Sequence, residues 1–138
     1  MMNKERIITV AIILCLLATT VACNKTAEDY FNSGNTKYDQ KDFKGAIQDY
    51  TNVIKLNPKN SDAYYIRGNT KYELKDYRGA IQDYNKAIEL NPKDYEAYNN
   101  RGLAKISLGQ KKDGCLDLSK AGELGHAQAY EAIKKNCN

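Results

Sequence analysis

The sequence has almost no histidine, and this scarcity removes much catalytic and metal-binding chemistry from consideration. Its 138 residues include one His, His126, and no Trp. A Ser-His-Asp or Cys-His system would have to use His126, and nothing near it in the sequence suggests a nucleophile. The chain also has no Gly-rich phosphate loop, no His-Glu-x-x-His and no Cys-x-x-Cys. We therefore expect a protein that is not an enzyme and that binds no cofactor or metal ion.

An excess of one charge is also missing. Lys and Arg number 21 and Asp and Glu 17, for a formal net charge of +4, and the Lys residues are interspersed with acidic ones. This predicts a solvated surface of mixed charge and argues against a nucleic-acid partner. With 42% apolar and 28% charged residues, the composition is that of an ordinary globular protein, and the length suits one modest domain.

Only one long apolar run is present, close to the N-terminus. Residues 7–22 are apolar apart from three Thr, and Lys4 and Arg6 precede them. A membrane-spanning helix needs about 20 apolar residues, whereas the core of a signal peptide is shorter. We therefore predict that residues 1–22 are a signal peptide.

A cysteine follows this run in the order Thr20-Val21-Ala22-Cys23. The pattern resembles the lipobox of bacterial lipoproteins, whose Cys is acylated and becomes the mature N-terminus. The resemblance implies lipidation of Cys23, a lipid-anchored linker over 23–26, and attachment to a membrane of the cell envelope, facing the periplasm or the outer surface. Thr20 stands where the family prefers Leu, so simple cleavage after Ala22 and an uncleaved anchor remain alternatives.

The other cysteines divide between the leader and the C-terminus. Cys15 lies in the leader, while Cys115 and Cys137 form an even pair in an exported protein, where disulfides persist. If the last two helices are antiparallel, both residues lie about 14 Å from the turn between them and could meet. A disulfide would contribute about 3 kcal/mol. Two buried free thiols are the alternative, and a metal site is disfavoured because no ligand partners accompany them.

A repeat of constant length organises the rest of the chain. Gly34, Gly68 and Gly102 are 34 apart, and Pro58 and Pro92 continue the same register to His126. Residues 27–60 and 61–94 are identical at 19 of 34 positions, and 95–128 form a more divergent third copy. Apolar residues recur at helical spacing in each copy, which predicts helices over 27–40, 43–56, 61–74, 77–90, 95–108, 112–124 and 127–136.

This period and pattern resemble the tetratricopeptide repeat, a pair of antiparallel helices. The resemblance implies an all-α fold, a superhelical solenoid of three helix-turn-helix repeats with a capping helix over 129–138. Residues 120–127 resemble the related Sel1-like repeats. Asp42 and Asp76 are placed to cap the second helices, and the three glycines, one in each copy, predict close approach of the paired helices. We expect looser packing in the third copy, where Gly114 replaces Ala.

In tetratricopeptide arrays the first helices line a concave groove that holds peptides or helices of partner proteins. The resemblance assigns these positions to this groove: Phe31, Asn35, Tyr38, Tyr65, Asn69, Tyr72, Asn99, Leu103 and Ile106. Chaperone-binding members grip a C-terminal carboxylate with two Lys, two Asn and an Arg. Only Asn35 matches that clamp here, and the other positions hold Phe31, Ile66, Glu96 and Asn100, so we expect no chaperone-tail binding of this kind.

Two functions follow as expectations. The first is an interaction scaffold at the cell envelope that binds a protein or peptide of unknown identity in the groove and is itself a monomer. The second is a structural envelope lipoprotein that self-associates without a discrete groove ligand. Concentration-dependent oligomers would favour the second function.

Overall fold

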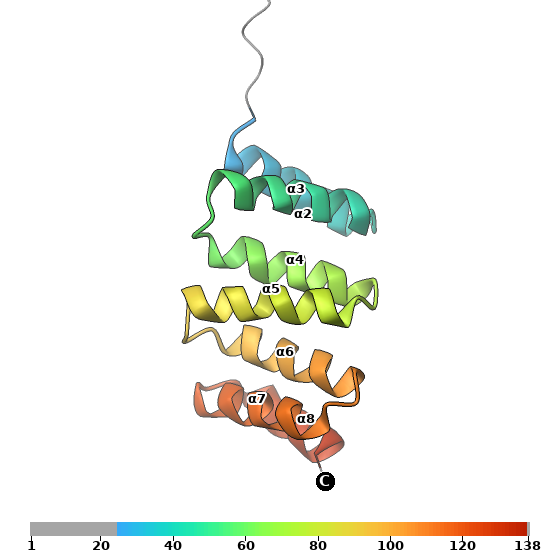
Figure 1. The fold of residues 1–138 in the computed structure, drawn as a ribbon, viewed down its shortest axis with the longest axis vertical. Helices are drawn as coiled ribbons and strands as arrows, with labels where there is room; N and C mark the ends of the chain where they lie inside the picture. The colour runs from blue at the N-terminus through green and yellow to red at the C-terminus, as the bar shows by residue number, and fades with distance from the viewer. Residues whose placement is uncertain (1–24, 138) are drawn as a thin grey trace, which may run out of the picture.

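The computed structural model describes residues 25–137, so the expected signal peptide, 1–22, and the lipid site, Cys23, lie outside the described residues. Within this range the chain forms helices and no strands (Figure 1). The helices are α2 (Ala27–Asp39), α3 (Phe43–Leu56), α4 (Ser61–Glu73), α5 (Tyr77–Leu90), α6 (Tyr95–Ser107), α7 (Lys111–Glu123) and α8 (Ala127–Asn136).

The helices stack one after another along the long axis of the molecule, from α2 and α3 at one end to α7 and α8 at the other (Figure 1). Each helix packs mainly against those before and after it in the chain, and α4 also contacts α6. This arrangement confirms the predicted all-α solenoid of helix pairs. We call α2, α4 and α6 the first helices, and α3, α5 and α7 the second helices.

Side-chain caps begin most of the helices. Asp42 accepts a hydrogen bond from the Gly45 amide at 3.0 Å, and Asp76 accepts one from the Gly79 amide at the same distance, as the sequence predicted. The Thr26 hydroxyl accepts a hydrogen bond from the Asp29 amide, and the Asp29 side chain bonds back to the Thr26 amide. These caps satisfy N–H groups that have no partner inside the helix.

Glycine lets the first two helix pairs pack around a buried tyrosine. Tyr50 and Tyr84 are fully buried in the second helices. A Cβ atom on Gly34 would lie 2.7 Å from Tyr50 Cε1, and one on Gly68 would lie 2.8 Å from Tyr84 Cε1. Both glycines therefore make room for a ring, which is the close approach that their spacing predicted.

The third helix pair, α6 and α7, packs in a different way. A Cβ on Gly102 would lie 2.8 Å from the carbonyl oxygen of Gly114, and Leu118 replaces the tyrosine as the buried residue. Two glycines facing each other let the backbones of α6 and α7 come together, and these helices contact each other as extensively as the other pairs. The expectation of looser packing here was wrong, because the smaller side chains are compensated by a closer approach.

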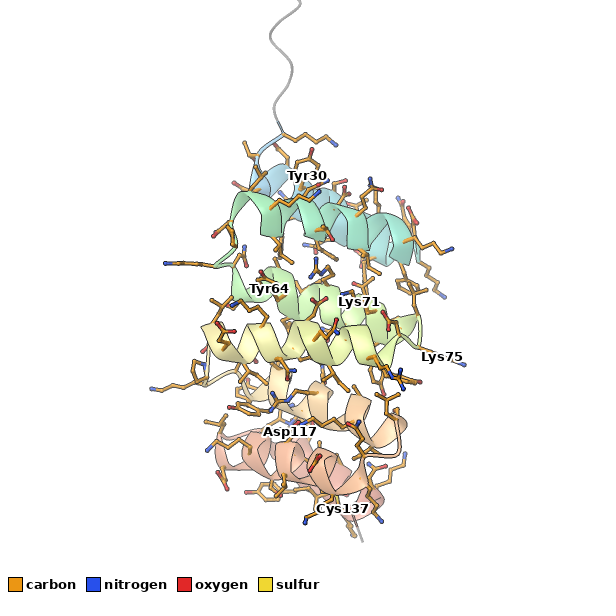
Figure 2. All side chains as sticks on the ribbon, viewed as in Figure 1. Tyr30, Tyr64, Lys71, Lys75, Asp117 and Cys137 are labelled. Carbon is orange, nitrogen blue, oxygen red and sulfur yellow. A yellow bond between two sulfur atoms is a disulfide. The ribbon has the colours of Figure 1, made fainter. Side chains whose placement is uncertain are left out.

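A buried aspartate in each second helix holds cations from the first helices. Asp83 accepts two hydrogen bonds from Arg67, at 2.9 and 2.6 Å, and pairs with Lys71 Nζ at 2.7 Å. Figure 2 shows Lys71 lying inside the stack, whereas Lys75 projects from its edge. Arg67 also donates to Thr51 Oγ1 in the preceding pair, at 3.0 Å.

The same arrangement recurs in the next repeat and, in reduced form, in the preceding one. Asp117 binds Arg101 and Lys105, and Arg101 reaches Asn85 of the preceding pair at 2.8 Å. In the first pair, Asp49 binds Lys37 and the hydroxyl of Ser33, and no arginine pairs with it among residues 25–137. These charges belong to the interior, so the interpretation of the charged residues as a uniformly solvated surface was wrong for them.

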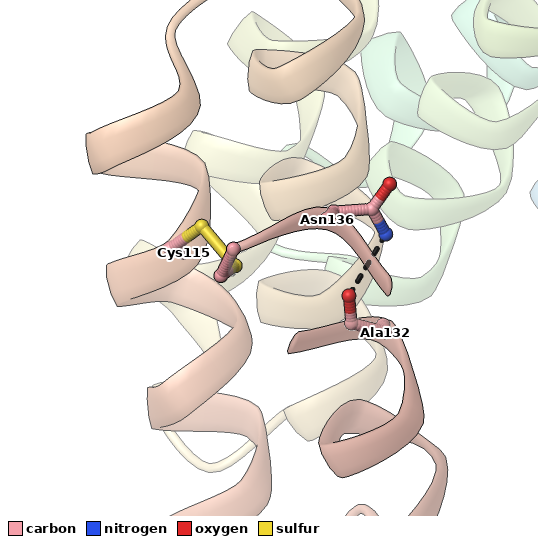
Figure 3. The surroundings of a disulfide bond; sticks show 4 residues. Cys115, Ala132 and Asn136 are labelled. Atoms are coloured by element: carbon pink, nitrogen blue, oxygen red, sulfur yellow. Dashed lines mark hydrogen bonds between the residues drawn. A yellow bond between two sulfur atoms is a disulfide. The ribbon is translucent and has the colours of Figure 1, made fainter. Parts of the chain in front are cut away.

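The C-terminal helix α8 is joined to α7 by a covalent bond. The sulfur atoms of Cys115 and Cys137 form a disulfide, which lies beside the last turn of α8, where Asn136 Nδ2 donates to the Ala132 carbonyl (Figure 3). Ala129 is buried and Ile133 is half-buried, whereas Tyr130 is 63% exposed. Its ring lies beside Gly122 of α7.

Residues 25–137 contain neither a membrane-spanning helix nor a cluster of metal-ligating side chains. No helix over residues 25–137 combines the length and apolar character that crossing a membrane requires. In that same part of the chain, no three His, Cys, Asp or Glu side chains gather as a metal site would need.

Candidate groove on the first-helix face

The surface formed by α2, α4 and α6, which we call the first-helix face, is supported by two part-buried hydrogen bonds from the second helices. The Tyr50 hydroxyl donates to Asn35 Oδ1 at 2.8 Å, and the Tyr84 hydroxyl donates to Asn69 Oδ1 at 2.7 Å. Burial raises the pKa of Tyr50 to about 12, so this hydroxyl stays a donor at physiological pH. Each asparagine is thereby fixed in orientation between the core and the surface.

Two adjoining hollows run across this face from α2 to α6. The larger has a volume of about 400 Å³ and is lined by residues of α2, α3 and α4: Asn35, Tyr38, Asp39, Tyr50, Ile66 and Asn69. The other has about 260 Å³ and reaches α6: Tyr38, Asn69, Tyr72, Glu73, Tyr84, Asn100 and Leu103. Because they share Tyr38 and Asn69, the two hollows form one continuous groove, which we call the central groove.

A third hollow lies at the N-terminal ends of α2 and α4. It has about 280 Å³ and is lined by Ala27, Glu28, Phe31, Asn60 and Asp62. The Phe31 ring packs edge-on against Tyr50, with ring centroids 6.0 Å apart. This hollow therefore lies on the same face as the central groove.

Asn100 ties α6 to α4 at the far end of the central groove. Its Nδ2 donates to Asn69 Oδ1 at 3.0 Å and to the Tyr65 hydroxyl at 3.2 Å, while its Oδ1 accepts from Asn99. Asn69 Oδ1 thus accepts two hydrogen bonds, from Tyr84 and Asn100. What the Asn69 side chain can still offer a ligand is the N–H of its Nδ2 group. A ligand at Asn69 would have to offer an acceptor such as a main-chain carbonyl.

Aromatic rings form one wall of the groove. Tyr38 packs edge-on against Phe43, with ring centroids 5.4 Å apart, and Tyr72 packs in the same way against Tyr77 at 5.1 Å. Both tyrosines are half-buried. Rings held in this way offer contact area at a small entropy cost, because their rotamers are already restricted.

The structure distributes the nine predicted groove residues over different places. Asn35, Tyr38, Asn69, Tyr72 and Leu103 line the central groove, and Phe31 lines the hollow beside it. The other three take part in packing or internal hydrogen bonds. Tyr65 packs against the core around Tyr84, Asn99 bonds to Asn100, and Ile106 lies against Gly114 of α7.

Several groove residues were missed by the sequence analysis. Glu73 and Asp39 line the central groove beside Tyr38, and Ile66 and Asn100 were considered only as mismatches to a carboxylate clamp. Asn35, the one match to that clamp, accepts its hydrogen bond from Tyr50. The repeat register carried a usable signal, because Asp39 and Glu73 occupy equivalent positions in successive repeats.

Carboxylates act directly on the rings of this face. Burial raises the pKa of Tyr38, and the negative charges of Glu73 and Asp39 raise it further. The pKa of Tyr65 is also raised, mainly by burial, with a contribution from Glu96. The groove therefore combines aromatic surface with negative potential.

His126 lies away from this face, at the start of α8. Its ring stacks on Tyr95 with centroids 5.2 Å apart, and its buried Nδ1 has no hydrogen-bond partner among the described residues. It follows Gly125, whose φ of 102° allows a three-residue turn between α7 and α8. His126 thus ends this turn as the residue that precedes α8.

Comparison with known families supports the interpretation of the repeats. The family model described as "TPR repeat" matches residues 34–75 and, in a second match, residues 68–109. Together the two matches cover more than half of the chain. No curated protein sequence matches it significantly.

Solved structures with the same architecture cover most of the chain. The Arabidopsis OM64 TPR domain is 33% identical, covers 80% of this chain and 93% of its own, and superposes with a TM-score of 0.77. The first TPR of Spaghetti (RPAP3), bound to the HSP90 peptide SRMEEVD, is 26% identical, with coverages of 80% and 90% and a TM-score of 0.77. The TPR2B domain of yeast Sti1, in its pHsp70 complex, is 26% identical, with coverages of 78% and 90% and a TM-score of 0.73.

Proposed function

The chain belongs to the tetratricopeptide repeat family, and on that premise we propose that it is a non-enzymatic interaction scaffold that binds a peptide segment of a partner protein in the central groove. The observation that carries this proposal is the continuity of the groove across three first helices, with Tyr38 and Asn69 common to both of its parts. A site that spans several helix pairs suits an elongated ligand better than a compact small molecule.

The chemistry of the groove supports a peptide ligand. Tyr38 and Tyr72 offer ring surface for side chains, and Asn69 offers N–H donors for main-chain carbonyls because its Oδ1 already accepts two hydrogen bonds. A peptide, SRMEEVD, is bound to one of the structural neighbours named above, the first TPR of Spaghetti (RPAP3). Its acidic sequence does not transfer to this chain, because no Lys or Arg stands at the clamp positions Phe31, Ile66, Glu96 and Asn100.

We further propose that this scaffold is exported and held at the bacterial cell envelope by lipid on Cys23. The support is the sequence order of basic residues, apolar run and small residues before a cysteine. The disulfide between Cys115 and Cys137 fits such a location, because disulfides persist in oxidising compartments. Incorporation of labelled palmitate that disappears in Cys23→Ser would support lipidation, and equal label in both proteins would contradict it.

The C-terminal part, 120–127, is proposed to be Sel1-like. The support is the three-residue turn after α7, which is shorter than the four-residue turns that contain Pro58 and Pro92. This turn directs α8 back onto α7, where the disulfide fixes it. The proposed role of this segment is to close the end of the array.

Site-specific photo-crosslinking in cells tests the groove. A photoreactive phenylalanine analogue would replace Tyr72 in the central groove or, as a control, Gln82 on the exposed surface of α5. We expect a partner protein to crosslink to position 72 and not to position 82. Crosslinks at position 82 alone, or to both positions equally, would contradict the groove. Crosslinks between copies of this chain would favour the structural, self-associating alternative.

A further inference from the structure

The cations of the first helices are all engaged inside the protein. The helices α2, α4 and α6 contain five Lys and Arg residues, and every one forms an ion pair or charged hydrogen bond with Asp49, Asp83 or Asp117. These cations are Lys37, Arg67, Lys71, Arg101 and Lys105. Three carboxylates of the second helices hold these five side chains and neutralise part of their charge, and none of the five lines the hollows of the first-helix face.

The acidic residues of the same helices lack this compensation. Asp39 and Glu73 are exposed, line the central groove, and form no ion pair with any residue between 25 and 137. Glu28 and Asp62 line the neighbouring hollow, and Glu96 lies at the start of α6. Within the described part of the chain, none of the residues lining these three hollows is Lys, Arg or His.

The first-helix face is therefore negative although the whole chain carries a formal charge of +4. The positive excess lies elsewhere. The hollow at the C-terminal end, for instance, is lined by Lys111 and Lys112 together with the disulfide. Charge segregation of this kind steers a ligand of opposite sign to one face and repels ligands of the same sign.

We propose that the central groove selects a cationic peptide segment, with a Lys or Arg side chain placed on the Tyr38 ring between Asp39 and Glu73. The proposal rests on the proposed function and specifies its ligand. A cation over a tyrosine ring is attracted by the π face, and two carboxylates beside the ring strengthen that attraction. The protein already uses this contact internally, with the guanidinium carbons of Arg67 and Arg101 at 5.7 and 5.2 Å from the ring centroids of Tyr64 and Tyr98.

The groove fits the rest of such a segment as well. Asn69 offers N–H groups to a main-chain carbonyl, and Leu103 and Ile66 give apolar contact on either side of it. An acidic tail would meet Asp39 and Glu73 at the centre of the site with no cation to receive it. The same carboxylates that attract a basic segment therefore exclude an acidic peptide such as SRMEEVD, which one structural neighbour binds.

Selection from a displayed random peptide library tests the proposal. The full 138-residue chain would be used in non-ionic detergent, with peptides of about 12 residues that extend over roughly 40 Å. The test variant is Asp39→Asn/Glu73→Gln, which keeps side-chain shape. The matched control is Glu89→Gln/Glu123→Gln, which removes the same charge from exposed residues of α5 and α7.

We expect the peptides enriched on the wild-type chain to be rich in Lys and Arg. Their affinity should fall about tenfold in the groove variant and less than twofold in the control, and should weaken as salt is raised. Synthetic copies of enriched peptides should also crosslink to the photoreactive residue at position 72.

Two other outcomes separate this inference from the proposed function. Peptides that crosslink at position 72 but are neutral or acidic, and bind the groove variant as tightly as the wild type, would overturn the cationic inference alone. Absence of any peptide that crosslinks at position 72 would overturn the groove as the binding site. An equal loss of affinity in the groove variant and the control would show that only the net charge of the chain matters, and would also overturn the inference.

Discussion

Removal of the disulfide should loosen α8 while the rest of the array keeps its stability. Cys115 lies in α7 and Cys137 directly follows α8, 22 residues later. The chain-entropy model gives about 3 kcal/mol for closing a loop of this length. Ala129 is the one residue of α8 that is buried, so little apolar packing remains to hold the helix once the bond is lost.

An energy of about 3 kcal/mol corresponds to roughly a hundredfold change in the equilibrium for local opening. Hydrogen exchange followed by mass spectrometry can read this change for each helix. In Cys115→Ser/Cys137→Ser, the amides of α8 should exchange about a hundred times faster than in the oxidised wild type, while those of α4 and α5 should be unchanged.

Two results would contradict this reasoning. Equal exchange of α8 in both proteins would show that noncovalent packing alone holds the helix. Equal acceleration in α4 and α5 would show that α8 unfolds only together with the whole array. A thiol titration of the unfolded wild type before each experiment establishes that the bond is formed.

Three further changes test the packing of the helix pairs by chemical denaturation. Gly68→Leu should lower the free energy of unfolding by about 3 kcal/mol, because even its Cβ would lie 2.8 Å from Tyr84 Cε1. Lys75→Gly should raise it by up to about 1 kcal/mol, because Lys75 has a φ of 61° in the turn between α4 and α5. Asp83→Asn should lower it by about 3 kcal/mol, since Arg67 and Lys71 would lose the carboxylate that they share. In the wild type, the free energy of unfolding should fall as the pH drops below about 4. Burial raises the pKa of Asp49, but hydrogen bonds from Lys37 and Ser33 outweigh burial, so the pKa is lowered overall. The stabilisation by the Asp49 carboxylate is therefore present above about pH 4 and is lost when the carboxylate is protonated.

Matched variants decide whether these effects have the stated causes. Gln48→Leu, on the exposed surface of α3, should leave stability nearly unchanged, and a loss equal to that of Gly68→Leu would contradict the packing argument. Lys93→Gly, in a turn without positive φ, should bring no gain. The acid sensitivity should weaken in Asp49→Asn, and an unchanged pH profile would assign it to other carboxylates.

Much of the fold could be predicted because the repeat constrains it at several levels. The constant period located the helix pairs, the caps at Asp42 and Asp76 marked where second helices begin, and the spacing of Gly34 and Gly68 predicted close packing. Local signals and the period agreed on the same answer, which is typical of sequences that specify one fold.

The groove was harder to predict, because its character depends on which side chains pair across helices. Asn35 was recognised as a groove position, but its hydrogen bond with Tyr50 requires the register between α2 and α3. Likewise, the sequence places both Lys71 and Glu73 on one helix, yet only the packing against α5 shows that Lys71 pairs with Asp83 while Glu73 lines the groove. The negative charge of the groove therefore depends on the tertiary structure. The sequence carried one signal of it, because an aspartate recurs at the position of Asp83 in every repeat.

The arginine bridges have a mechanical consequence for this groove. Arg67 holds Thr51 of the preceding pair and Asp83 of its own, and Arg101 connects Asn85 and Asp117 in the same way. A rotation that separated neighbouring pairs at these points would have to break one of these bonds. We therefore expect the array to act as a stiff template whose shape is set before a ligand arrives, so that the conformational entropy lost on binding falls on the flexible partner.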